Sequence, residues 1–300
     1  MWSVGGVVVV LAGLLIVLWL TSPSASEFSV QEATREIPAD WLETGTEAAD
    51  DVPSEEASEP DSDVEPASVG FQPFAARGVL ALTGDGEPFG EEIYELSITE
   101  EGSELTSSGR FWFKVLVARI TVSFEQSLIA DSALRPERYD MAFDGPLGFD
   151  RSMSATFSQD RAFITRDDET GETLVSADRA FVTGTFSTYT LVPRLYALRE
   201  EDGEAMLDLL MFGGPPNQEA DGDSAGGLPT IRVSRAGTAR IRAGETEITA
   251  ERYLIVSGLG VNELFARGDE FLAFRAISEE GSMLVYRFDY FPDGIEFVED

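Results

Sequence analysis

The side chains of this chain that are best suited to chemistry are its carboxylates, because histidine and cysteine are both absent. Adjacent pairs such as Glu91–Glu92 and Asp167–Asp168 have the composition of an acid–base dyad, in which one group donates a proton and the other accepts it. Adjacent residues on a strand point to opposite faces, however, and the other acidic runs lie in turn-forming sequence. We therefore interpret these carboxylates as exposed charges and expect no catalytic residues.

The missing residue types exclude several other kinds of site. Without cysteine and histidine there are no thiolate nucleophiles, Cys/His zinc sites or imidazole-based triads, and a serine hydrolase would need the lone lysine, Lys114, as its base. The stretches "DDETGE" (167–172) and "DGDSAGG" (221–227) offer oxygen ligands at calcium-like spacing, but neither has the length or the terminal glutamate of an EF-hand loop. We expect a protein that is not an enzyme and that holds no cofactor and no metal.

A second set of candidate residues is apolar and lies partly in a short repeat. The segments "ERYDMAFDG" and "ERYLIVSG" share the same Glu-Arg-Tyr start and both end on glycine. Period-two alternation places Tyr139, Met141 and Phe143 on one face of the first predicted strand, and Tyr253 takes the matching position in the second. Either an old duplication or shared strand chemistry accounts for the match. Both interpretations make these side chains packing or cavity-lining residues.

The elements that must position these residues are mostly strands. From Gly78 onward, apolar residues alternate or run together over strand lengths, separated by turn-forming glycine and acidic residues. The stretch Gly109–Phe124 is long enough for one long bent strand or a pair of strands. Residues 188–214 are a helical candidate. Residues 213–228 are a predicted flexible loop. The predicted fold is mainly β: a curved antiparallel sheet, half-barrel or β-clam in type, with one short central helix.

The N-terminal region predicts a membrane segment. Residues 4–20 carry no charge and nearly span a ~30 Å hydrocarbon core. Small residues at Ser24–Ser26 resemble a signal-peptidase site, but no basic residue precedes the apolar run and Trp19 suits an interfacial anchor, so both cleavage and retention stay open. Residues 1–26 are therefore predicted as a transmembrane anchor or signal. The bulk of the chain is expected outside the cytoplasm, in the periplasm or at the cell surface.

Residues 27–69 differ from the rest in composition. They hold 14 acidic residues and one arginine among prolines and serines, which is typical of a solvated, self-repelling linker. We expect a disordered spacer that contributes nothing to the core, with a specific acidic docking tail as the alternative and a candidate local contact point at "IPADWL" (37–42). The remaining domain, residues 70–300, still has a net charge of −21, which disfavours nucleic acid as a partner.

Several phrases together resemble a known group of proteins. "GEEIYELSI", "SGRFWFKV", "SALRPERYDMAFDG", "YTLVPRLYAL" and "GDEFLAFRA" resemble an uncharacterised family of bacterial envelope proteins classed as a domain of unknown function. Members of that family resemble the β-clam of the LolA/LolB lipoprotein carriers, and the likeness covers about residues 78–298. It implies a similar clam-shaped sheet but brings no catalytic residues with it. The acidic linker and the 215–228 insertion depart from a compact carrier.

Two functions follow from these observations. In the first, the membrane-anchored domain binds an apolar or lipid-like ligand in envelope maintenance or transport, and the concave face of its sheet lines the cavity. The alternative is a non-enzymatic scaffold or protein-interaction domain of the cell envelope, in which the same side chains form a dry core. A carrier needs an open apolar cavity, whereas a scaffold packs that face full. The expected lining residues are Phe111, Phe113, Tyr139, Met141, Phe143 and Tyr253.

Overall fold

The structure is a computed structural model of the 300-residue chain. It describes residues 35–38, 41, 73–115, 118–146, 150–166, 169–211, 229–257, 260–278 and 281–298. The predicted membrane segment, most of the predicted linker and the predicted 213–228 loop lie outside these ranges. In the part that the structure describes, no helix is both long and apolar enough to cross a membrane.

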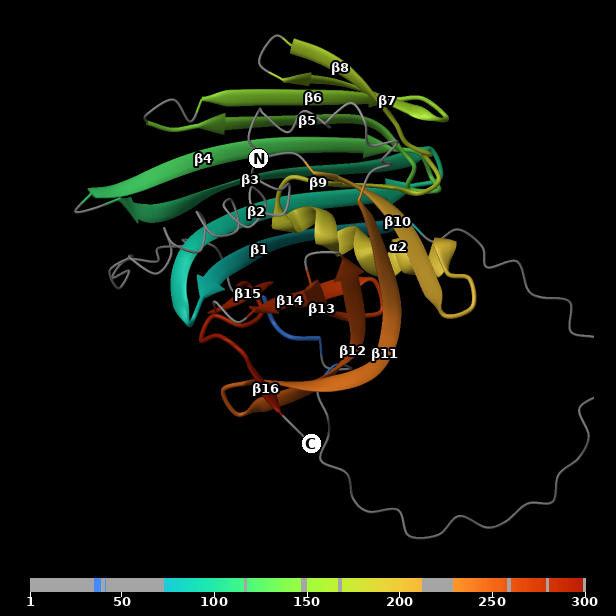
Figure 1. Ribbon diagram of the computed structural model, residues 1–300. Coiled ribbons are helices and arrows are strands. Elements are labelled where there is room, and N and C mark those ends of the chain that lie inside the picture. Colours follow the sequence, from blue (N-terminus) through green and yellow to red (C-terminus); the bar gives the residue numbers. More distant parts are fainter. Residues whose placement is uncertain are drawn as a thin grey trace, which may run out of the picture.

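The described chain forms one large sheet that doubles back on itself (Figure 1). The sheet order is β8-β7-β6-β5-β4-β3-β2-β1-β15-β14-β13-β12-β11-β10-β9, and β16 pairs separately with β11. Neighbouring strands are antiparallel except β9 and β10, which are parallel. The first arm contains β1 (Phe74–Gly84), β2 (Glu87–Thr99), β3 (Gly102–Val115), β4 (Ala118–Ala130), β5 (Pro136–Asp144), β6 (Arg151–Phe157), β7 (Arg161–Arg166) and β8 (Glu169–Leu174). The second arm contains β9 (Ala180–Thr183), β10 (Glu204–Met211), β11 (Thr230–Ala243), β12 (Thr246–Ser257), β13 (Gly260–Arg267), β14 (Glu270–Ser278), β15 (Gly281–Arg287) and β16 (Glu296–Val298).

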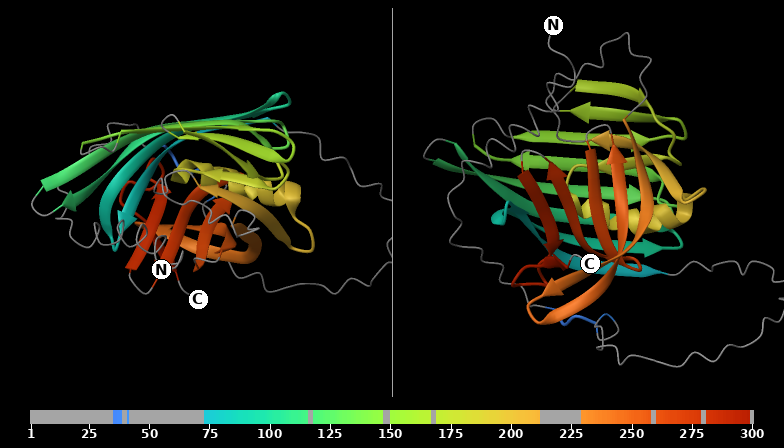
Figure 2. Two further views of the ribbon diagram at one scale, coloured as in Figure 1. Left: turned by 45° about the horizontal axis from the view of Figure 1, so that its top comes forward. Right: turned by 60° about the horizontal axis from the view of Figure 1, so that its bottom comes forward.

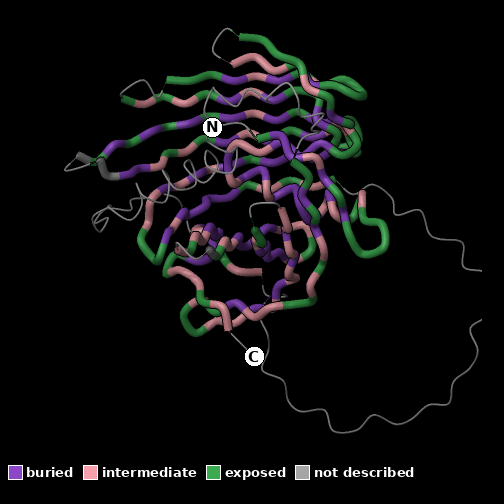
Figure 3. Tube along the Cα trace, in the orientation of Figure 1, coloured by how far each residue is buried: buried purple, intermediate pink, exposed green. Residues whose placement is uncertain are grey.

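Local sequence explains these strands and their turns. Along β2 the buried residues Glu92, Tyr94 and Leu96 alternate with more exposed ones, which is the period-two pattern of a strand with one covered face (Figure 3). The β1–β2 hairpin turns at Asp85 and Gly86, whose φ angles are 43° and 84°. An Asp-Gly pair with positive φ at both positions suits a two-residue hairpin that matches the twist of its strands.

The two arms enclose a short helical segment. The 3₁₀ helix η2 (Phe186–Leu191) leads directly into α2 (Val192–Arg199), and both lie between the arms (Figures 1 and 2). The helical segment contacts β2, β3, β9, β10 and β14. Its residues Leu191, Val192 and Leu195 are buried in the main core, together with inward-facing residues from both arms. The helical segment therefore covers the concave side of the sheet over these strands.

A second core lies on the other face of the second arm. It contains Phe265, Leu272 and Tyr286 from the sheet, and it is covered by Tyr290 and by the N-terminal residue Trp41. Trp41 is 7% exposed, although the sequence predicted a linker that contributes nothing to the core at this position. Of the expected local contact point at "IPADWL", the described residues Ile37 and Trp41 pack on this core.

The coarse fold prediction is confirmed: the chain is mainly β, with a large antiparallel sheet and one short helix. The helical candidate was too long, because α2 ends at Arg199 and Glu204–Met211 forms strand β10. Asp202 and Gly203 have φ angles of 53° and 84° and turn the chain between the two elements. The stretch Gly109–Phe124 is a pair of strands, parts of β3 and β4.

Candidate functional site

The six residues predicted to line a cavity lie in different parts of the core. Tyr139, Met141 and Tyr253 belong to the main core, where Tyr253 packs on Tyr196 of α2 with ring centroids 5.4 Å apart. The other three pack with one another in a smaller cluster at the far ends of β3, β4 and β5. Those three are Phe111, Phe113 and Phe143, with 6.3 Å between the Phe111 ring and each of the other two rings. The pairing register nevertheless places Phe111 and Phe113 of β3 on the same face of the sheet as Phe143, Met141 and Tyr139 of β5, with Tyr253 on the second arm. That these six side chains line a ligand cavity stays a prediction.

The concave face at Tyr139 and Met141 is covered. Gly184 lies directly against both side chains, because a Cβ at this position would be far inside contact distance of Tyr139 Oη and 2.5 Å from Met141 Sδ. Tyr139 is fully buried and Met141 is 3% exposed. No space for a ligand remains between these two side chains and the segment that leads into η2.

A buried carboxylate fastens that segment to the sheet. Glu92 on β2 is 0% exposed, and its Oε1 accepts hydrogen bonds from Ser107 Oγ at 2.7 Å and Thr185 Oγ1 at 2.6 Å. Its Oε2 accepts the backbone N–H groups of Phe186 at 3.0 Å and Ser187 at 3.2 Å. Glu92 therefore satisfies the first two free N–H groups of η2, as an acidic cap does at a helix start.

The hydrogen-bond network continues across β4 and β5. Gln126 Nε2 donates to Ser187 Oγ at 2.6 Å, and Tyr139 Oη donates to Gln126 Oε1 at 2.9 Å. Burial raises the pKa of Glu92 above its ordinary 4.5, while hydrogen bonds from Ser187, Thr185 and Ser107 pull that pKa back down. Burial also raises the pKa of Tyr139, and the nearby charge of Glu92 adds to that effect. The network positions η2; sequence reasoning missed it, because it treated Glu92 as an exposed charge.

A second buried charge cluster lies where β1 and β15 meet. Arg287 is 0% exposed and bonds both carboxylate oxygens of Asp289, at 2.8 and 2.7 Å, and Glu270. Its Nη1 also donates to Tyr94 Oη at 3.0 Å. Gly78 makes room for this guanidinium, because a Cβ there would lie 2.5 Å from Arg287 Nε. Every charge here has a protein partner, which is typical of a structural cluster.

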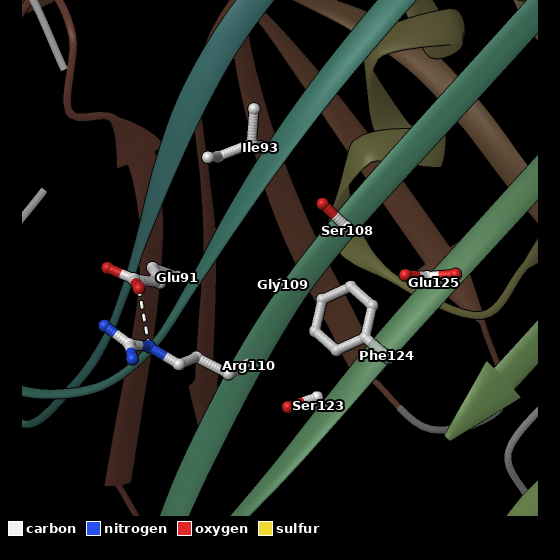
Figure 4. Close-up of a pocket in the computed structure, with 8 residues that line it drawn as sticks. All are labelled: Glu91, Ile93, Ser108, Gly109, Arg110, Ser123, Phe124 and Glu125. Atoms are coloured by element: carbon white, nitrogen blue, oxygen red, sulfur yellow. Dashed lines mark ion pairs between the residues drawn. The ribbon is translucent and has the colours of Figure 1, made fainter. Parts of the chain in front are cut away.

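A hollow of about 410 Å³ lies on the outer face of β2, β3 and β4, on the side of the sheet away from the helical segment (Figure 4). Glu91 and Arg110 form an ion pair of 2.6 Å at its edge, and Glu125 is exposed. The second oxygen of Glu91, Oε2, is buried and has no hydrogen-bond partner among the described residues. The complete lining is Glu91, Ile93, Ser108, Gly109, Arg110, Ser123, Phe124 and Glu125. This open, mixed-charge surface is unlike the apolar cavity that a lipid carrier requires.

Metal ligands are not gathered in the described ranges: no three Asp or Glu side chains there are arranged to hold an ion. Of the two predicted calcium-like loops, 221–227 lies outside the described residues, and Glu169–Glu172 of the other belongs to the edge strand β8.

In its described part the molecule is thus a large antiparallel β protein whose own helical segment covers the concave face at Tyr139 and Met141. No protein-family model matches the chain, and no curated protein matches it in sequence. It is similar to a crystal structure described as a beta-barrel-like protein of domain of unknown function DUF1849 from Brucella abortus. The two share 9% sequence identity with a TM-score of 0.44, over 74% of this chain and 97% of the other. The expected likeness to the LolA/LolB carriers stays a prediction.

Proposed function

We propose that the protein is a non-enzymatic scaffold or protein-interaction domain of the cell envelope, anchored in the membrane by residues 4–20 with its β domain outside the cytoplasm. The observation that supports this choice over a lipid carrier is the packing of the concave face. Tyr139 and Met141, which a carrier would use to hold its ligand, lie buried against Gly184 and η2. The proposed β-clam is therefore closed around its own chain.

The proposed partner-binding surface is the outer edge of β8, at the end of the first arm. Strand β8 is the last strand of the sheet, and no described strand pairs with its outer edge. Phe163 and Leu174 beside that edge are 43% and 67% exposed. An open edge presents unpaired backbone N–H and C=O groups to which an extended segment of a partner protein adds as a further strand.

A lipid-like ligand remains the second candidate, and one observation favours it. The segment that fills the concave face is rich in hydroxyl groups, with Thr185, Ser187, Thr188 and Thr190 all buried. Exposing such a segment to water costs less free energy than exposing an apolar one, because its hydroxyl groups form hydrogen bonds with water. In this alternative, an acyl chain replaces η2 against the sheet.

One experiment separates the two functions. Mass spectrometry of the protein purified from its host membrane under native conditions should show no stoichiometric lipid, and a fluorescent fatty acid should not bind. Met141→Trp should then lower the free energy of unfolding by ~1–3 kcal/mol, because it overpacks a filled core. A bound lipid, or fatty-acid binding that Met141→Trp abolishes without loss of stability, would establish the carrier instead.

A further inference from the structure

The N-terminal segment Arg35–Trp41 is fastened at its described residues to β1 and to the second arm. The Arg35 backbone N–H donates to Asp289 O at 2.7 Å, and Arg35 Nη1 donates to Arg77 O at 2.5 Å. At the other end of the segment, Arg267 Nη1 donates to Trp41 O at 2.9 Å. Both ends of this segment, which we call the strap, therefore have hydrogen-bond partners in the domain.

Apolar packing adds to these hydrogen bonds. The Trp41 ring meets the Tyr290 ring edge-on with centroids 5.3 Å apart, and Ile37 packs on the same core cluster. The guanidinium of Arg35 lies 5.8 Å from the Tyr290 ring centroid, within the range of a cation–π contact. The strap is docked on the domain by its backbone hydrogen bonds, its buried tryptophan and the cation–π contact. The composition of this region had predicted a free linker.

Docking the strap shortens the tether between the domain and the predicted membrane segment. The 14 residues from Thr21 to Thr34 reach at most about 50 Å, whatever their conformation. Without the strap the tether would be the 52 residues from Thr21 to Gln72, with a reach of at most about 190 Å. The residues between Trp41 and the start of β1 are then not part of the tether.

The position of the strap also defines which end of the domain lies nearer the tether. The strap and the β11–β12 turn beside β16 lie at one end of the molecule, and β6, β7 and β8 lie at the other (Figures 1 and 2). Trp41 belongs to the same core cluster as Ile241 of β11 and Ile248 of β12, the two strands that meet at this turn.

We propose that the strap keeps the β11–β12 end of the domain nearer the lipid surface and points the free edge of β8 away from it. This inference builds on the proposed function, because it assumes the membrane anchor at residues 4–20. It assigns the strap a positioning role: the partner-binding edge is presented at the far side of a closely tethered domain.

The test uses the full chain in lipid vesicles. Because the chain has no cysteine, Glu245→Cys in the β11–β12 turn and Thr170→Cys on β8 each give one labelling site. Energy transfer from a donor dye at each site to acceptor lipids reports its proximity to the bilayer. We expect higher transfer from position 245 than from position 170.

Two matched insertions make the test independent of the probe positions. About 30 Gly/Ser residues inserted after Ser26 lengthen the tether ahead of the strap, and they should lower the transfer from both sites. The same insertion after Ser58 adds residues between the strap and β1, outside the tether, so it should leave both signals unchanged. Trp41→Ala should undock the strap, abolish the difference between the two sites, and make the second insertion as effective as the first.

The outcomes separate this inference from the proposed function. Equal effects of the two insertions in the unsubstituted chain would overturn the strap's role, even if the protein sits in the vesicles. A chain that fails to co-sediment with vesicles would remove the anchor and this inference with it. If Trp41→Ala lowers the melting temperature, the two insertions in the otherwise unchanged chain still decide the matter.

Discussion

The buried carboxylate of Glu92 gives the sharpest test of how the helical segment is held. Two substitutions separate its hydrogen-bonding role from its charge. Glu92→Gln keeps the shape and one oxygen acceptor, whereas Glu92→Met keeps only the approximate volume. Glu95→Gln, on the same strand but exposed, is the matched control, since its ion pair with Arg77 is exposed and contributes little.

The hydrogen bonds of Glu92 determine the expected magnitudes. In Glu92→Gln the amide oxygen takes the position of Oε2 and accepts both backbone N–H groups of η2, and the amide nitrogen donates to hydroxyl oxygens that rotate to accept it. This variant should change the free energy of unfolding by less than about 1 kcal/mol near neutral pH. In Glu92→Met the N–H groups of Phe186 and Ser187 lose their acceptor. Two buried unsatisfied donors should cost about 2–6 kcal/mol.

The pKa of Glu92 adds a pH dependence with a definite sign. Because burial raises this pKa above 4.5 in the folded state, the stability that Glu92 contributes is fully present below pH 4.5 and is lost as pH rises through the raised pKa. Glu92→Gln has no such titration. The stability of the wild type relative to Glu92→Gln should therefore fall as pH increases from 4.5 towards neutrality.

Urea unfolding at a series of pH values measures all three variants, with circular dichroism as the probe. Equal losses in Glu92→Gln and Glu92→Met would refute the reasoning, because the acceptor oxygen would then have no role at η2. A wild-type advantage over Glu92→Gln that grows with pH would refute the raised pKa. A large effect of Glu95→Gln would show that charge on β2 matters in general.

Three further predictions concern packing and a buried ion pair. Gly184→Ala should destabilise the fold by ~1–3 kcal/mol because its Cβ meets Tyr139 and Met141, whereas Gly171→Ala, which has no neighbour within 4 Å, should be close to neutral in the same unfolding assay. Trp41→Ala should cost ~3 kcal/mol, and deletion of residues 1–69 should cost at least as much; equal melting temperatures of the full and truncated chains would contradict this. Arg287→Met should cost ~3–5 kcal/mol, since it leaves two carboxylates without their cation, and a loss smaller than 1 kcal/mol would contradict the buried ion-pair assignment.

Local patterns predicted the strands because burial alternates along each one, as β2 shows. The same local reasoning failed where two patterns overlap. Leu191 and Leu195 have helical spacing and are buried on η2 and α2, but Leu198 is 56% exposed and the chain turns soon after it. The apolar residues that follow alternate with period two in β10, and only the Asp202–Gly203 turn marks the change.

The candidate site was beyond local reasoning because its partners are distant in sequence. Glu92 meets Thr185 and Ser187 more than 90 positions further along the chain, and alone on its strand it looks like an exposed acid. Arg287 packs against Tyr94 and Gly78 in the same way. Trp41 is one aromatic residue in an acidic stretch, and its burial depends on Tyr290 at the other end of the chain. Such contacts depend on the order of strands in the sheet, which no short motif encodes.

The position of β1 in the sheet has a consequence for biosynthesis. One edge of β1 pairs with β2 as soon as the hairpin forms, but the other edge waits for β15, with Leu80 opposite Arg287. At a synthesis rate of roughly 5–20 residues per second, about 200 residues take some 10–40 s to appear. During that time an edge containing Leu80, Ala81 and Leu82 has no partner strand from β15, and such edges promote aggregation. We therefore expect newly made chains to need protection by a chaperone until the last strands have emerged.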